Sequence, residues 1–321
     1  MASLKGKVVV VTGGSSGIGR AAAVEFARRG ARVIVAARRA DALEDTVRLC
    51  LEAGGEAWAV PTDVTHDGDV QRLMQASLGV EGRIDVWVNN AGTTLFAPLD
   101  QGPFDDHLRV IDTNLFGAMR CSRLLVPVFK RQRQGVLINV GSILSKIGQP
   151  YSPSYVVSKF GLRGLCETLR TEFSTLPEVH VCSFLPYTVA TPYFESAANY
   201  TGLLPHPLPP VQDPTEVARA LVDLAEHPQR ERHVPRSAWL GLALHRVMPT
   251  LVERTLLQVL KSWHLGPELA ANHQGALVAP QAHSATVHGT SAAKSDGLHL
   301  FGWVVRSLAG RRPSPPAPLG T

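Results

Sequence analysis

Short apolar runs alternate with helical stretches along most of the chain. The runs are rich in β-branched residues, as in strands that are buried on both faces of a sheet. This alternation is typical of βαβ units, and it predicts a doubly wound α/β fold, a parallel sheet with helices on both faces. The expected strands cover residues 7–11, 31–37, 57–61, 84–89, 135–140 and 179–185, with a last one near His233 and Val234.

The pattern breaks at residues 193–210. This region is rich in Tyr, Asn and Pro, which predicts a mobile loop of the kind that often closes over a substrate. A helix is expected at 214–226, with Asp213 as its N-cap and Pro214 at its first position. We therefore assign residues 1–235 to one α/β domain.

Residues 236–265 form an amphipathic helical extension, with apolar positions on one side and polar positions on the other. Arg246 interrupts the apolar side and Pro249 predicts a kink, so the roughly 20 successive apolar residues that span a bilayer are absent. Two interpretations remain open: a peripheral membrane contact, or packing on the domain or on a second copy. Residues 266–321 turn to Ala, Ser, Gly, His and Pro, which predicts a largely flexible tail.

The composition narrows the class of protein. With 321 residues, 45% of them hydrophobic and 18% charged, the chain can bury a large core. The net charge of +5 arises in residues 235–321, whereas charges balance in the domain. The domain therefore lacks the basic face of a nucleic-acid binder, and we expect no nucleic-acid partner.

The cysteines favour a reducing compartment. They are widely spaced and form no Cys-x-x-Cys pair, so neither a metal site nor a disulfide framework is expected. The amino terminus lacks the apolar stretch of a secretory signal. These observations predict a cytoplasmic protein, with the membrane contact through residues 236–265 left open. The four cysteines are Cys50, Cys121, Cys166 and Cys182.

A glycine-rich turn follows the first expected strand. Residues 12–19 have the sequence Thr-Gly-Gly-Ser-Ser-Gly-Ile-Gly and lead directly into a helical stretch. Gly13 permits the sharp turn, Gly17 lets a phosphate approach the backbone, and Gly19 allows the helix to pack on the strand. Because a helix N-terminus holds anions, this turn predicts a dinucleotide pyrophosphate site. The plainer alternative is a turn that only joins a strand to a helix.

The end of the second expected strand indicates which dinucleotide would bind. An acidic residue there would hold the ribose hydroxyls and repel a 2′-phosphate, but the sequence has Arg38 and Arg39. A guanidinium binds phosphate through two N–H groups and stacks on adenine, so this pair favours NADP(H) over NAD(H). The alternative is that both arginines cap a loop in solvent. Asp63, after the third strand, is expected to meet the adenine amino group.

Tyr155 and Lys159 lie four residues apart on an expected helix and therefore on one of its faces. A tyrosine has an ordinary pKa of about 10, so it needs a partner to exchange a proton near neutral pH. A nearby ammonium favours the phenolate. The pair predicts a general acid and base.

These motifs together resemble the short-chain dehydrogenase/reductase family over about residues 4–235. The glycine turn matches the Thr-Gly-x-x-x-Gly-x-Gly loop of that family, and Asn89-Asn90-Ala91-Gly92 matches its segment after the fourth strand. Asn114 in Asn-Leu-Phe-Gly, Ser142 after the fifth strand, Tyr155 and Lys159 match its catalytic set.

The resemblance implies a Rossmann-type nucleotide domain and a role for single residues. Tyr155 would protonate the substrate oxygen in reduction, or accept its proton in oxidation, and Ser142 would bind that oxygen. Lys159 would bind the nicotinamide ribose and lower the pKa of Tyr155, while Asn114 would hold a water of the proton relay. The residues expected to bind the cofactor are Gly13, Ser15, Ser16, Gly17, Ile18, Gly19, Arg38, Arg39, Asp63, Val64, Asn90, Ala91, Gly92, Tyr155, Lys159, Pro186, Val189 and Thr191.

One position departs from the family pattern. Where the family has Pro-Gly, this chain has Pro186-Tyr187, so either the loop is rearranged or its backbone angles are ordinary. Lys146 is the cation expected nearest to the substrate, and the other cleft candidates are mostly apolar, which favours a hydrophobic substrate. These candidates are Ile143, Leu144, Tyr151, Tyr187, Tyr193 and Phe194.

The sequence therefore predicts an NADP(H)-dependent oxidoreductase that interconverts a carbonyl and an alcohol on a hydrophobic small molecule. The alternative is a non-catalytic nucleotide sensor or scaffold on the same fold, which we would expect to have lost a member of the catalytic set. By resemblance, a homo-oligomer is expected through long helices at about 104–130 and 153–173.

Overall fold

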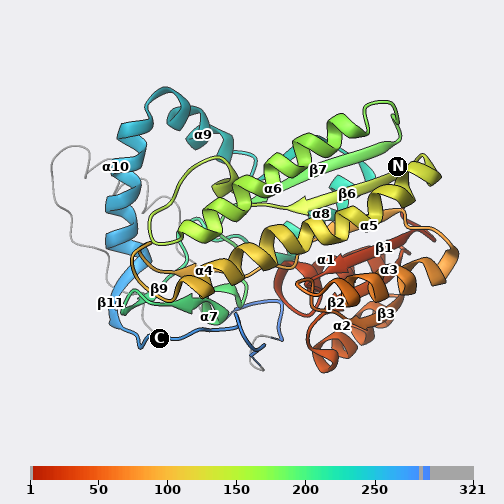
Figure 1. Cartoon of the computed structure of the whole chain (residues 1–321), viewed down its shortest axis with the longest axis horizontal. Helices are drawn as coiled ribbons and strands as arrows, with labels where there is room; N and C mark the ends of the chain where they lie inside the picture. The colour runs from red at the N-terminus through yellow and green to blue at the C-terminus, as the bar shows by residue number, and fades with distance from the viewer. Residues whose placement is uncertain (1–2, 282–284, 290–321) are drawn as a thin grey trace.

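The central sheet of the computed structural model has seven parallel strands in the order β10-β7-β6-β4-β1-β2-β3 (Figure 1). The structure describes residues 3–281 and 285–289, and the number of strands is given for those residues. The predicted doubly wound fold is confirmed, and the strand order reverses between β1 and β4, where such sheets bind ligands. The strands are β1 (Val8–Thr12), β2 (Arg32–Ala37), β3 (Glu56–Pro61), β4 (Val86–Asn89), β6 (Gly135–Val140), β7 (Val179–Pro186) and β10 (Glu231–Val234).

Helices cover both faces of this sheet. In β1, Val9 and Val11 face one layer while Val8 and Val10 face the other, and all four are fully buried. A strand enclosed in this way has no polar side, which is why it is a continuous apolar run in the sequence. The first layer contains α1 (Gly17–Arg28), α2 (Ala40–Glu52) and α8 (Pro214–Glu226), and the second contains α3 (Asp67–Glu81), α5 (Gly117–Gln132) and α6 (Pro153–Glu172).

The long helix expected at about 104–130 contains a π-helical turn. The structure has α4 (Phe104–Ile111), the π-helix η1 (Asp112–Phe116) and then α5. Such turns are inserted within α-helices, frequently at functional sites. Asn114 lies in this turn and is 1% exposed, so the turn directs an expected catalytic residue into the protein.

The region 193–210 contains more regular structure than its composition predicted. It forms a short helix, α7 (Tyr193–Ser196), and two strands, β8 (Ala198–Asn199) and β9 (Leu203–Pro205). β8 pairs with β5 (Leu95–Phe96), and β9 pairs with β11 (Leu265–Leu269). The expectation of a loop without elements was wrong because strands this short show no periodicity in the sequence.

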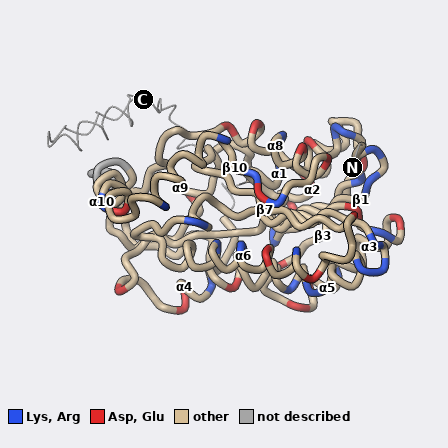
Figure 2. The backbone as a smooth tube through the Cα atoms, turned by 90° about the horizontal axis from the view of Figure 1, so that it is seen from above, with Lys and Arg blue, Asp and Glu red and all other residues tan. Residues whose placement is uncertain are grey.

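The amphipathic extension consists of two helices, α9 (Ala238–Val247) and α10 (Pro249–Val259), followed by the π-helix η3 (Leu260–His264). They are divided at the expected proline, and they project from one end of the sheet (Figure 1). Figure 2 shows acidic and basic residues interspersed over the domain, whereas α9 is mostly uncharged. None of the helices in residues 3–281 or 285–289 is long and apolar enough to span a membrane.

The tail after residue 265 was expected to be largely flexible, but the part that the structure describes is bonded to the domain. β11 pairs with β9, and residues 270–281 and 285–289 form backbone hydrogen bonds with the domain. Composition alone gave no signal for these bonds because they use peptide groups rather than side chains. Residues 282–284 and 290–321 of the expected tail lie outside the described residues.

All four cysteines are buried free thiols. Burial raises the pKa of Cys50, Cys121 and Cys182 to about 12, and it also raises the pKa of Cys166. Thiolates are therefore disfavoured at each position near neutral pH.

Candidate active site

A cavity of about 680 Å³ lies at the carboxyl ends of the strands, beside the point where the strand order reverses. It brings together residues from the glycine loop, the ends of β2, β3, β4 and β6, the start of α6 and the loop after β7. Gly19 and Asn114 lie behind its wall, and every other residue expected to bind the cofactor or act in catalysis lines it.

The glycine loop is packed so closely that side chains are excluded. A Cβ at Gly19 would lie 2.2 Å from the Gly13 carbonyl oxygen, and a Cβ at Gly13 would lie 2.9 Å from the Cα of Ala91. Gly17 has a φ of 52°, in the left-handed region that favours glycine. The resulting concave backbone at the start of α1 fits the pyrophosphate of a dinucleotide.

Arg38 and Arg39 line the cavity at the end of β2, as the sequence predicted. Each also donates a hydrogen bond to the C-terminal segment, which was not predicted. The Arg38 Nη2 lies 2.7 Å from the Ala276 carbonyl oxygen, and the Arg39 Nη1 lies 2.7 Å from that of Gln281. Asp63 lines the same end, and its Oδ1 accepts hydrogen bonds from the Thr65 N–H and hydroxyl at 2.9 and 2.7 Å.

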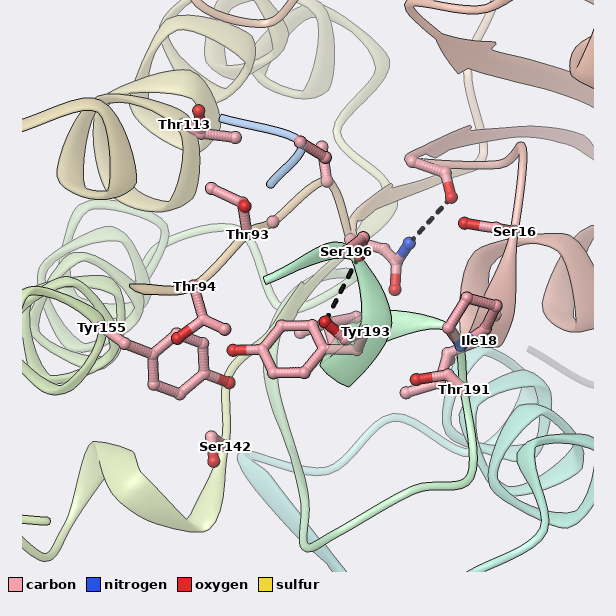
Figure 3. Close-up of a pocket in the computed structure, with 18 of the residues that line it drawn as sticks. Ser16, Ile18, Thr93, Thr94, Thr113, Ser142, Tyr155, Thr191, Tyr193 and Ser196 are labelled. Atoms are coloured by element: carbon pink, nitrogen blue, oxygen red, sulfur yellow. Dashed lines mark hydrogen bonds between the residues drawn. The ribbon is translucent and has the colours of Figure 1, made fainter. Parts of the chain in front are cut away.

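Tyr155, Ser142 and Lys159 meet at the other end of the cavity, and Figure 3 shows the first two of them. Ser142 follows β6, and its Oγ accepts a hydrogen bond from the Leu144 N–H at 3.1 Å and also hydrogen-bonds the Tyr155 hydroxyl. The Lys159 Nζ lies 5.4 Å from the centre of the Tyr155 ring and donates to the Val140 carbonyl at 2.8 Å. The structure thus joins the residues that the helical spacing and the family resemblance placed together.

The environment of Tyr155 differs in one respect from the expectation. Burial raises the pKa of Tyr155, while hydrogen bonds from Tyr193 and Ser142 lower it. Burial also lowers the pKa of Lys159 to about 8. Because the ammonium lies over the phenol ring and is bound to the Val140 carbonyl, burial rather than this cation sets the direction of the Tyr155 shift.

Asn114 connects the loop after β4 to α6. Its Oδ1 accepts from the Thr93 N–H at 2.8 Å, and its Nδ2 donates to the Thr93 carbonyl at 2.9 Å and to the Ser158 Oγ at 3.1 Å. Ser158 in turn donates to the Tyr155 carbonyl at 2.7 Å. The expected role of Asn114 in a water relay stays a prediction, and these bonds give it a positioning role as well.

Tyr193 contacts Tyr155 directly. The centres of the two rings are 5.9 Å apart and the ring planes meet at 66°. The Tyr193 hydroxyl hydrogen-bonds both Tyr155 and Thr94, and Figure 3 shows it pointing between them. The sequence predicted Tyr193 as a cleft residue but gave no signal for this bond, and it missed Thr94 entirely.

Apolar and aromatic side chains make up part of the remaining lining, beside polar residues such as Gln149, Ser152 and Thr188. Ile143, Leu144, Tyr187 and Phe194 line the cavity as expected, together with the unpredicted Phe96, Leu208 and His264.

Three further expectations for this end are resolved by the structure. Tyr151 is absent from the lining and instead packs against the buried cluster around Leu208. Lys146 also lies off the lining and forms an ion pair with Glu231. Among the described residues, Tyr187 does not have a positive φ. Its backbone angles are therefore ordinary, and a tyrosine can stand where the family has glycine.

Comparisons with known proteins agree with this geometry. Residues 7–200 match the short chain dehydrogenase family. The chain is 34% identical over 260 residues to "Uncharacterized oxidoreductase YxnA" of Bacillus subtilis, covering 80% of this chain and 73% of that protein. It is 34% identical over 229 residues to a 3-oxoacyl-[acyl-carrier-protein] reductase of Synechocystis, covering 71% and 92%, respectively.

A solved structure also resembles this chain. It is an alcohol dehydrogenase of the archaeon Thermococcus sibiricus in complex with 5-hydroxy-NADP. The TM-score is 0.63 at 29% sequence identity, and the match covers 71% of this chain and 96% of that chain. A 3beta-hydroxysteroid dehydrogenase of Eggerthella lenta is 38% identical over 191 residues, covering 59% of this chain and 73% of that protein.

Proposed function

The chain belongs to the short-chain dehydrogenase/reductase family of oxidoreductases, and from this premise we propose that it interconverts a carbonyl and an alcohol with NADP(H). The observation that carries the proposal is the meeting of Tyr155 with Ser142 and Lys159 in one cavity with the glycine loop. Tyr155 is the proposed general acid and base. The substrate is a hydrophobic small molecule, because aromatic and aliphatic side chains line the cavity around Tyr155.

The choice of NADP(H) is supported by the end of β2. Arg38 and Arg39 line the cavity where an acidic residue would hold the ribose of NAD(H), and guanidinium groups bind a 2′-phosphate. The similar alcohol dehydrogenase was solved with 5-hydroxy-NADP. Relatives named as an oxoacyl reductase and a hydroxysteroid dehydrogenase support carbonyl and alcohol chemistry.

Each residue of the site would have its own role in the reaction. A bound nicotinamide would supply or accept the hydride. The Ser142 hydroxyl would donate a hydrogen bond to the substrate oxygen, and the Tyr155 hydroxyl would give that oxygen a proton during reduction. Lys159 would place positive charge beside the phenolate that remains. Asn114 would hold the loop after β4 and the helix α6 at the spacing that Ser142, Tyr155 and Lys159 require.

The alternative of a non-catalytic sensor or scaffold is less well supported, because Asn114, Ser142, Tyr155 and Lys159 are all retained.

The four buried free thiols favour the proposed cytoplasmic, reducing environment.

A panel of hydrophobic ketones, aldehydes and alcohols tests the proposal, with NADPH and NADH assayed in parallel. Tyr155→Phe is expected to lower the rate by about 10²–10⁴-fold, because it removes the proton donor. NADPH binding, followed by its fluorescence, should persist in that variant. Preference for NADH would contradict the assignment of Arg38 and Arg39. Tight NADPH binding without turnover of any compound would favour the sensor.

A further inference from the structure

The chain crosses the mouth of its own cavity after β11. Residues 275–281 and 285–289, here called the C-terminal strap, contact several separate parts of the domain. At the first contact the Ala276 N–H donates to the Ser196 carbonyl in α7 at 2.8 Å. Leu277 is 8% exposed and belongs to the apolar cluster of Leu95 and Val110, against which Tyr155 also packs.

The second and third contacts lie on the nucleotide-binding elements. Arg38 and Arg39, at the end of β2, donate to the strap carbonyls at residues 276 and 281. At the start of α1, the Gly17 N–H donates to the Thr286 carbonyl at 2.8 Å, and Arg20 donates to the Ala285 carbonyl.

The strap then returns to the loop after β7. The Gly289 N–H donates to the Ala190 carbonyl at 3.2 Å, and the His288 Nε2 lies 2.9 Å from the Asp213 Oδ2. The two described parts of the strap therefore connect α7, β2, α1 and the loop that precedes α7. Figure 1 shows this blue segment beside α7 and the first strands of the sheet.

The strap lines the cavity with residues in the range 276–281, and its Thr286 carbonyl takes the Gly17 N–H that a bound pyrophosphate would otherwise use. Its inner side lines the same cavity as Arg38, Asp63 and His66, and about 680 Å³ remains open. One carbonyl takes a single N–H of a guanidinium, which carries five, so Arg38 can hold the strap and a phosphate together. The strap residues that line the cavity are Ala276, Leu277, Val278, Pro280 and Gln281.

We propose that the C-terminal strap is the outer wall of the dinucleotide site and holds the adenosine half of NADP(H) against the ends of β2 and β3. The inference rests on the proposed cofactor and extends its site to residues that the family motifs do not include. Because the strap crosses the mouth, it must swing out whenever the nucleotide enters or leaves. Nucleotide exchange is therefore slow, and the strap sets its rate.

The test measures NADPH release from the full-length chain by stopped-flow fluorescence, with excess NADP⁺ as the competitor. Ala276→Pro removes the N–H that binds Ser196, and Leu277→Ala removes the buried side chain. Each variant should release NADPH about tenfold faster or more, since each loses an attachment of the closed strap. His245→Ala is a control outside the strap, because His245 contacts Glu253 on the distant helices, and it should leave release unchanged.

Three other outcomes overturn the proposal, and they differ from one another. Lower melting temperatures with unchanged release would give the strap a purely structural role. Faster association with unchanged release would make it a competitor of the nucleotide. If the unmodified chain bound no NADPH at all, the proposed function itself would fail, whereas the first two results leave that function standing.

Discussion

Lys159 combines burial with a charge at the centre of the site. The residue is 5% exposed, and its ammonium donates to the Val140 carbonyl at 2.8 Å. Burial lowers its pKa from 10.5 to about 8. Lys159 is therefore protonated at neutral pH but close to titration, which suits the role proposed for Tyr155 beside it.

The lowered pKa has a measurable effect on stability. Between pH 8 and 10.5 the unfolded chain binds more protons at this position than the folded chain, so stability rises with pH in that window. Lys159→Met lacks this contribution. The free energy of unfolding of the unmodified chain relative to Lys159→Met should increase by about 2 kcal/mol from pH 8 to pH 10. Urea unfolding of both proteins measures this difference, and parallel pH curves would show that the lysine is not desolvated.

Tyr193 should tune the proton transfer of Tyr155. Its hydrogen bond lowers the pKa of Tyr155, so Tyr193→Phe should raise that pKa and move the pH–rate curve of alcohol oxidation to higher pH. Lys159 on α6, Tyr187 in the loop after β7 and His264 on η3 titrate near this end of the cavity, and all remain in the variant.

A second tyrosine of the same region supplies the control for that variant. The Tyr200 hydroxyl donates to the Asp106 Oδ2 at 2.6 Å, outside the cavity lining. Tyr200→Phe should lower the melting temperature without moving the pH–rate curve. Equal curves for Tyr193→Phe and the unmodified chain would remove Tyr193 from the proton chemistry.

At the residue scale, the sequence predicted groups whose positions are fixed by local spacing. Tyr155 and Lys159 share a helix face, and Ser142 follows a strand, so their meeting follows from the fold. The contact between Tyr193 and Tyr155 depends on how the region 193–210 folds back, which no local pattern encodes.

At the element scale, the start of α1 depends on the absence of side chains. Gly19→Ala would place a Cβ 2.2 Å from the Gly13 carbonyl oxygen. This oxygen belongs to the backbone, so relieving the clash would require the glycine loop to move. We expect a loss of about 2–4 kcal/mol in the free energy of unfolding, together with loss of NADPH binding.

Gly79 on α3 provides the comparison for that substitution. A Cβ there meets nothing within 4 Å, and the residue is exposed. Gly79→Ala should therefore stabilise the protein by about 0.5–1 kcal/mol through helix propensity. Chemical unfolding and NADPH fluorescence measure both variants, and similar effects of the two substitutions would contradict the packing argument.

The elements were predictable to different degrees for a physical reason. Strands buried between two helical layers are continuous apolar runs, so each strand of the central sheet was expected near its observed position. β5, β8 and β9 were missed because a strand of two or three residues is too short to show a period. β11 was missed because its sequence, Leu-Gly-Pro-Glu-Leu, contains a glycine and a proline, which indicate a break rather than a strand. α8 was expected with its bounds and its Asp213 cap, because Asp-Pro is a specific signal for a helix start.

At the scale of the whole molecule, large apolar side chains are exposed on α4, η1, α5 and α6. Large exposed apolar side chains are common at protein interfaces, so the homo-oligomer expected through these helices stays a prediction that assigns its interface to this surface. They include Leu108 (47% exposed), Phe116 (47%), Met119 (42%), Val157 (56%) and Phe160 (43%).

Charge on these helices should separate the copies. Met119→Glu and Phe160→Glu are each expected to shift the protein toward the monomer in light scattering after size exclusion, since an interface cannot bury an unpaired carboxylate. Leu51→Glu is the control, because Leu51 is 54% exposed on α2, away from these helices. A monomeric unmodified chain would refute the expected assembly. Membrane contact through α9 and α10 stays a separate prediction.

The buried thiols give a practical consequence. All four native cysteines are inaccessible and resist ionisation, so a maleimide dye should leave them unmodified in the native fold. Val278 on the C-terminal strap is 56% exposed. A cysteine introduced there would be the selective attachment point for a fluorophore. The four buried cysteines would not have to be replaced first, because they would not react with the dye.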